Sequence, residues 1–252
     1  ISPIIVLCVR PYNPLLDTAG IPKFDKILPE HIVPAVTQVL KESERNLSAL
    51  ESRFVPSWAG LIKPLEELSI PFEYAWNPIG HLLGVKNSKE LREAHEKMLP
   101  QVVEFGLRME QSKPIYDGLL AVKESPEWLK LNSAQRRVVE LKIRDANLAG
   151  VGLPVEAQNR FNQISTELSQ LSTDFSNHVM DSTKAYEMII TDMDETKGWP
   201  VNLKQQASQS YNQSNETKAS KTDEGPWRIS LEASIVIPFL RHSRMRGHRK
   251  KL

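Results

Sequence analysis

One stretch decides the predicted fold: residues 154–190, PVEAQNRFNQISTELSQLSTDFSNHVMDSTKAYEMII. Its apolar side chains recur at spacings of three and four residues, at Phe161, Ile164, Leu168, Leu171 and Phe175. This spacing places them on one face of a long α-helix, close to the seam of a coiled coil. Because such a helix stays folded in water mainly by packing its apolar face, we expect other helices of the chain to cover this stripe.

The ends of this helix are marked by Pro and Gly. Pro154 suits a first helical turn, and Gly152 would interrupt a helix that arrives from the N-terminal side. Neither residue type occurs again before Gly198, so the predicted helix continues to about Ile190.

Composition favours helices elsewhere as well. The chain has 252 residues, of which 40% are hydrophobic and 25% charged, enough for the core of one large or two small domains. Aromatic residues make up only 7%, which is unlike an all-β chain. We therefore predict a mostly α fold, a multi-helix bundle or array with one long central helix. Upstream helices are predicted at 30–52, 71–87, 102–109, 114–122 and 133–149, the last ending just before Gly150. Two more are predicted to begin at Ser57 and at Asn87, the latter as an N-cap.

The amino-acid composition becomes more polar after residue 191. Residues 192–226 are polar and are expected to form a linker, with at most one weak helix from 201 to about 213. Residues 227–231 alternate apolar and polar side chains, which predicts a short C-terminal strand. Because nothing after it is an obvious strand partner, we expect 227–252 to be the start of an incomplete region. The expected divisions are thus 1–12, 13–191, 192–226 and 227–252.

Residues 1–12 are interpreted as an atypical extension. The apolar run from 4 to 9 is too short for a membrane span or a usual signal core, so no membrane contact is expected. Cys8 is the only cysteine and cannot form an internal disulfide, which favours a reducing compartment. We expect a cytoplasmic protein, with a mitochondrial or other organellar location after removal of a transit peptide as the alternative.

Charge is unevenly distributed. Residues 241–252 carry six Lys or Arg and no acidic residue, although the net charge of the chain is only +1. No aromatic residue interleaves these basic residues, so we interpret the tail as a solvated helix face and expect no nucleic-acid partner.

No catalytic, cofactor-binding or metal-binding residue is predicted from the motifs. A His-Glu-x-x-His zinc motif is absent, and its nearest match, His95-Glu96, has Leu99 in place of the second His. We interpret His95 as part of a solvated helix face. Asp174, His178 and Asp181 share one side of the long helix and are interpreted as a His with acidic neighbours, a metal site being the alternative. Further absent signatures are a dinucleotide loop (Gly150-Val151-Gly152 lacks the third Gly), a Gly-x-Ser-x-Gly elbow, a Walker loop and a His partner for Cys8.

Several collinear segments resemble the oligopeptidase A-like members of the thimet oligopeptidase family of zinc metallopeptidases. They include NPLL at 13–16, FDKILPEHIVPAV at 24–36, HLLGVKNSKELREA at 81–94, SKPIYDGLLAVKESPEW at 112–128 and GPWRISLEASIVIPFL at 225–240. The resemblance covers residues 13 to about 242 and corresponds to the N-terminal part of the family. Residues 192–222 fit it loosely, and 1–12 have no counterpart.

The resemblance implies a helical clamshell whose deep channel admits short peptides. In the family a His-Glu-x-x-His helix and a later Glu hold zinc, and the metal-bound water attacks the peptide carbonyl. Those residues lie downstream of the matched region, so none carries over. The resemblance therefore implies that this chain forms one wall of the channel. It also implies a chain that is truncated before the zinc helix and is inactive alone. The alternatives are a helical protein-interaction module that self-associates through the stripe and, less favoured, a nucleic-acid binder.

Overall fold

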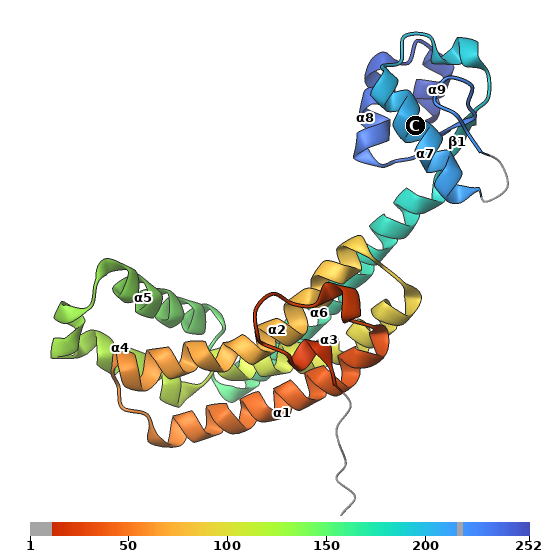
Figure 1. Ribbon diagram of the computed structural model, residues 1–252. Helices are drawn as coiled ribbons and strands as arrows, with labels where there is room; N and C mark the ends of the chain where they lie inside the picture. The colour runs from red at the N-terminus through yellow and green to blue at the C-terminus, as the bar shows by residue number, and fades with distance from the viewer. Residues whose placement is uncertain (1–11, 216–218) are drawn as a thin grey trace, which may run out of the picture. The chain divides into compact units, whose positions relative to one another are not determined.

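The computed structural model describes residues 12–215 and 219–252 (Figure 1). These residues are mostly α-helical and contain one two-stranded antiparallel sheet, which confirms the predicted fold class. The chain divides into two compact units between Leu171 and Ser172. The expectations for Cys8 and the rest of residues 1–11 lie outside the described residues.

The first unit is built on three long helices, α1 (Pro29–Arg53), α2 (Lys63–Val85) and α3 (Lys89–Glu110). The helix α1 packs along both α2 and α3. One core cluster joins them through apolar residues that recur at helical spacing. Its members include Ile32, Val36, Ile79, Leu82, Leu91, Met98 and Val102.

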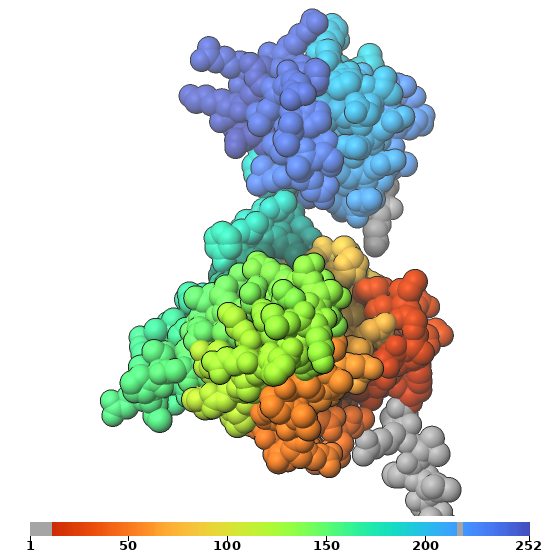
Figure 2. Space-filling view, turned by 90° about the vertical axis from the view of Figure 1, so that its left-hand side faces the viewer, coloured from red at the N-terminus to blue at the C-terminus, as the bar shows by residue number. Residues whose placement is uncertain are grey.

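Two shorter helices, α4 (Lys113–Glu124) and α5 (Ser133–Leu148), complete a second cluster at the other end of α1. Gly118 is required there, because a Cβ on this residue would lie 2.5 Å from the Phe54 ring. In the space-filling view the green surface of α4 and α5 lies directly against the orange surface around the end of α1 (Figure 2). The buried side chains between them include Leu47, Leu61, Ile62, Ile115, Leu119, Val122 and Val139.

Four upstream boundaries differ from the prediction, one of them because the segment 71–87 is no separate helix and its residues up to Val85 belong to α2. The N-cap of α3 is Ser88, whose hydroxyl accepts from the Leu91 amide, whereas the Asn87 side chain donates to the Leu83 carbonyl of α2. The segment 102–109 is no separate helix, because α3 runs through Pro100. The helix after Ser57 opens with a π-turn, Trp58–Ile62, before α2 begins.

The long helix, α6, spans Val155–Ala185 and is shorter at its C-terminal end than predicted. Gly150 precedes it with a φ of +88°, the left-handed conformation expected of a residue that ends α5. Met188–Ile190, expected as the end of the helix, forms strand β1 instead.

The second unit contains β1, α7 (Val201–Ser214), β2 (Trp227–Ile229), α8 (Ala233–His242) and α9 (Arg246–Lys251). The strands are antiparallel, with Met188 opposite Ile229 and Ile190 opposite Trp227. The predicted strand therefore has a partner, so the expectation that it lacks one is wrong, while the incomplete region expected at 227–252 stays a prediction. The partner was missed because the apolar run at 188–190 also continues the helical pattern.

The polar segment 192–226 is also different from expectation. The helix α7 lies close to the one expected from 201 to about 213, but its Leu203, Ala207 and Tyr211 are buried, so this part belongs to a core. Trp199 lies between Trp227 and Phe239, with ring centroids 6.3 and 5.3 Å away. The domain divisions expected at 12, 191 and 226 stay a prediction, and the compact units divide elsewhere.

Candidate functional site

The apolar stripe of α6 is an exposed apolar feature of the described chain. We use this name for Phe161, Ile164, Leu168, Leu171 and Phe175. Phe161 is half-buried, and the exposed fraction rises from 40% at Ile164 to 58% at Leu168 and 70% at Phe175. No residue of α6 is buried. The expectation that other helices cover the stripe is therefore wrong for the residues that the structure describes.

The physical reason is that, within the first unit, α6 contacts the preceding helices through its polar face. Asn162 Oδ1 accepts a hydrogen bond of 2.7 Å from Gln111 Nε2, which also donates to the Ala149 carbonyl. A hollow beside this contact is lined by Pro100, Glu104 and Leu107 of α3 and, from α6, by Asn159, Asn162, Gln163, Thr166, Glu167 and Gln170. Each residue advances a helix by about 100°, so the stripe lies on a different face of α6 from Asn162 and Thr166. Because Asn162 and Thr166 lie toward α3, the stripe points away from it.

The predicted metal candidates do not form a metal site. Among residues 12–215 and 219–252 there is no group of three or more His, Cys, Asp or Glu side chains that could hold an ion. Asp174, His178 and Asp181 lie on α6, where His178 and Asp181 are exposed.

His95 is the clearest residue that the sequence reasoning misplaced. Only 9% of it is exposed, and its ring stacks on Trp76 with centroids 4.7 Å apart. Its Nδ1 is buried without a hydrogen-bond partner among the described residues, and burial lowers the pKa of the imidazole. A signal was present, because Leu91, His95, Met98 and Val102 recur at helical spacing and all are buried.

An ion pair joins α1 to α3 at the start of α4. Both terminal nitrogens of Arg108 donate to Glu51, each at 2.7 Å, and the Ser112 hydroxyl donates to Glu51 Oε1. The Arg108 guanidinium holds the pKa of the Glu51 carboxyl below its ordinary value. Sequence reasoning could not find this pair, because its residues are 57 positions apart.

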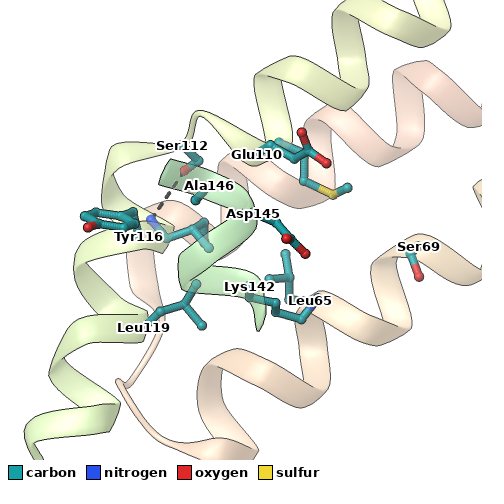
Figure 3. Close-up of a pocket in the computed structure, with 11 residues that line it drawn as sticks. Leu65, Ser69, Glu110, Ser112, Tyr116, Leu119, Lys142, Asp145 and Ala146 are labelled. Carbon is teal, nitrogen blue, oxygen red and sulfur yellow. Dashed lines mark hydrogen bonds between the residues drawn. The ribbon is translucent and has the colours of Figure 1, made fainter. Parts of the chain in front are cut away.

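A pocket lies between α2, α3, α4 and α5 in the first unit (Figure 3). Leu65, Met109, Ile115, Leu119 and Ala146 supply its apolar lining. Glu110 and Asp145 also line this pocket, and the Asp145 carboxylate lies just above Leu65 (Figure 3). Partial burial and the nearby Asp145 raise the pKa of Glu110. The pocket was not predicted, since four separate elements build it.

The basic tail folds as the end of α8 and as α9. Arg241, Arg244 and Arg246 are exposed, whereas Arg249 is half-buried and donates to the Ser243 carbonyl. None of the helices in residues 12–215 and 219–252 combines the length and the hydropathy needed to span a membrane. The expectation that the tail binds no nucleic acid stays a prediction.

Comparison with known proteins relates the chain to one group of peptidases. Residues 36–158 match the family model "Neurolysin/Thimet oligopeptidase, N-terminal domain". The probable cytosolic oligopeptidase A of Arabidopsis thaliana is 39% identical over 241 residues, which are 95% of this chain and 34% of the relative.

Other relatives agree with this match. The organellar oligopeptidase A, chloroplastic/mitochondrial, of the same plant is 39% identical over 243 residues, covering 95% of this chain and 30% of its own length. Oligopeptidase A of Escherichia coli (strain K12) is 39% identical over 189 residues, 75% of this chain and 28% of the relative. The chain thus spans about a third of the length of the relatives it matches.

Proposed function

Because the chain belongs to the thimet oligopeptidase family and corresponds to the N-terminal region of oligopeptidase A, we propose that it is the helical channel wall of a metalloendopeptidase that hydrolyses short peptides. The observation that carries the proposal is the identity of 39% along 95% of this chain. The helical first unit, with α1, α2 and α3 packed into one core, suits a rigid wall.

The metal of such an enzyme does not fit the described residues. They contain no group of three ligand side chains, and His95 is stacked on Trp76 with no second His one turn away. We therefore place the zinc of a full-length enzyme outside residues 12–215 and 219–252 and derive no chemical step from it here. The chain alone is expected to be inactive.

The proposed partner is a short peptide, and the proposed compartment is the cytoplasm. One plant relative is named cytosolic and the other chloroplastic/mitochondrial, so an organelle is the alternative.

The test is a chimera in which these 252 residues replace the matched third of the cytosolic relative from Arabidopsis thaliana. A quenched fluorescent peptide of about ten residues reports hydrolysis. We expect the chimera to cleave the peptide and a chelator to stop cleavage. The 252-residue chain with equimolar zinc should not cleave it. Chelator-sensitive cleavage by the chain alone, or a folded but inactive chimera, would contradict the proposal.

A second candidate is a helical interaction module without catalytic activity. The exposed stripe of α6 favours it, because spacings of three and four suit pairing with the same stripe of a second copy. Analytical ultracentrifugation decides this candidate. A stable dimer that dissociates on changing Leu168 and Leu171 to Asp would support it, and a monomer throughout the micromolar range would rule it out.

A further inference from the structure

The pocket of the first unit has a mostly apolar lining, to which Glu110, Lys142 and Asp145 add charged side chains. Its volume is about 140 Å³. A single water molecule needs only ~10–15 Å³ of such a volume, so the pocket has room for a side chain. Leu65 and Leu119 are almost fully buried and form its wall together with Ile115 and Ala146.

Carboxylate oxygens at the mouth are available to accept hydrogen bonds. Among the described residues the Glu110 side chain has no hydrogen-bond or ion-pair partner, and Glu110 is exposed. Asp145 bonds Arg144, yet both of these hydrogen bonds end on Oδ1, which leaves Oδ2 as a second acceptor. The two carboxylates come from different helices, α3 and α5.

The cations near the mouth are already engaged. Lys142 lines the pocket, but its Nζ lies 2.6 Å from Glu66 Oε1. Arg144 is held by Asp145. Neither cation forms an ion pair with Glu110, so within residues 12–215 and 219–252 this carboxylate at the edge of an apolar cavity has no counter-charge.

We propose that this pocket binds a lysine side chain presented by a peptide or protein segment, with its methylenes along Leu65 and Leu119 and its ammonium between Glu110 and Asp145. An ammonium group offers three donors in diverging directions, which suits acceptors from two helices better than the planar fork of arginine does. The aliphatic stem of lysine gains from burial while its charged end stays at the rim. This inference is independent of the proposed peptidase function.

The test is a titration of the 252-residue chain followed by NMR, with methyl signals of Leu65, Ile115 and Leu119 as reporters. The probe is N-acetyl-lysine methylamide, and N-acetyl-norleucine methylamide is the control with a hydrocarbon side chain and no ammonium. We expect saturable shifts at these methyl groups and about tenfold weaker binding of the norleucine compound. Equal affinities, or shifts spread over the whole surface, would overturn the proposal.

Three variants sharpen the test. Glu110→Gln is expected to weaken lysine binding about tenfold, whereas Glu104→Gln, on the same helix and outside the pocket lining, leaves it unchanged. Lys142→Met removes the nearest competing cation and is expected to strengthen binding. Equal losses in both Glu variants would reveal a general charge effect and overturn the site.

A further probe, n-butylamine, separates a lysine side chain from a free amine. Binding of the lysine compound at least as tight as that of n-butylamine supports the proposal. Binding of n-butylamine alone would contradict it, because the backbone that carries a lysine would then not fit the mouth. Unchanged circular dichroism of each variant confirms that the fold is retained.

Discussion

His95 is the single side chain for which burial has the clearest consequence for stability. Its pKa lies below the ordinary 6.5 because the ring is buried, so the unfolded chain binds a proton more readily than the folded one. The stability contribution of a neutral His95 is therefore complete above pH 6.5 and is lost as the pH falls toward the lowered value.

The variant His95→Phe retains a ring against Trp76 but has no group to protonate. When the pH is lowered from 7.5 to 5.5, we expect its free energy of unfolding to fall less than that of the wild type. The difference is at most about 1.4 kcal/mol for each pH unit below 6.5. Urea unfolding at both pH values measures it, with His178→Phe on the exposed surface of α6 as control. Identical pH dependence of His95→Phe and wild type would show that His95 is not a buried neutral group.

Arg108 supplies the second prediction at this scale. Changing Arg108 to Met removes two charge-assisted hydrogen bonds from Glu51, whose side chain is only 14% exposed. We expect a loss of about 1 to 2 kcal/mol at pH 7, moderated because Arg108 itself is 39% exposed.

The pH dependence of that loss has a definite sign. The pKa of Glu51 is lowered in the folded state, so its contribution is present above the ordinary 4.5 and disappears as the pH falls through the lowered value. The effect of Arg108→Met should therefore shrink in acid. Urea unfolding measures it, and Arg45→Met, on the exposed side of α1, is the control. A loss that persists unchanged in acid would contradict the ion pair.

The sequence predicted local features at this scale and missed those that depend on distant partners. Ser57 as a cap and Gly150 as a terminator follow from short-range chemistry and are confirmed. The pocket and the Arg108–Glu51 pair were not predictable, because no local pattern brings separate helices together.

At the scale of elements, α6 shows what periodicity can and cannot tell. Spacing predicted a long helix here, and α6 confirms it over Val155–Ala185. It could not tell whether another element covers the stripe, because the polar residue Asn162 makes the contact with Gln111. The same limit applies to Met188–Ile190, whose apolar side chains suit a helix or a strand until β2 provides a partner.

The exposed stripe gives a prediction about stability. Leu168→Ala should change the free energy of unfolding by less than about 0.5 kcal/mol, as for surface positions generally. The matched change Leu119→Ala, at a position only 2% exposed, should cost about 2 to 5 kcal/mol. Chemical denaturation of both variants tests this difference. Equal costs would mean that the stripe is covered in solution.

At the scale of the whole molecule, the length of the relatives bears on what covers the stripe. This chain spans about a third of their length, and under the proposed function the remaining part of such an enzyme covers the stripe. Charged residues introduced there should then be harmless in the 252-residue chain and damaging in the chimera.

We expect the pair Leu168→Asp and Leu171→Asp to lower the melting temperature of the chimera by several degrees and to leave that of the 252-residue chain nearly unchanged. Differential scanning calorimetry of both proteins makes the comparison. Glu104→Gln, away from the stripe, serves as the control in each. No difference between the two proteins would show that the stripe stays exposed in the longer one.

The most direct measurement is the rate at which the chimera hydrolyses a quenched short peptide, with and without a chelator, beside the 252-residue chain at equimolar zinc. If this chain is the channel wall of an oligopeptidase A-like metalloendopeptidase, the chimera cleaves the peptide, the chelator abolishes cleavage, and the chain alone shows none. Zinc-dependent cleavage by the chain alone, or a well-folded chimera without activity, would contradict that role.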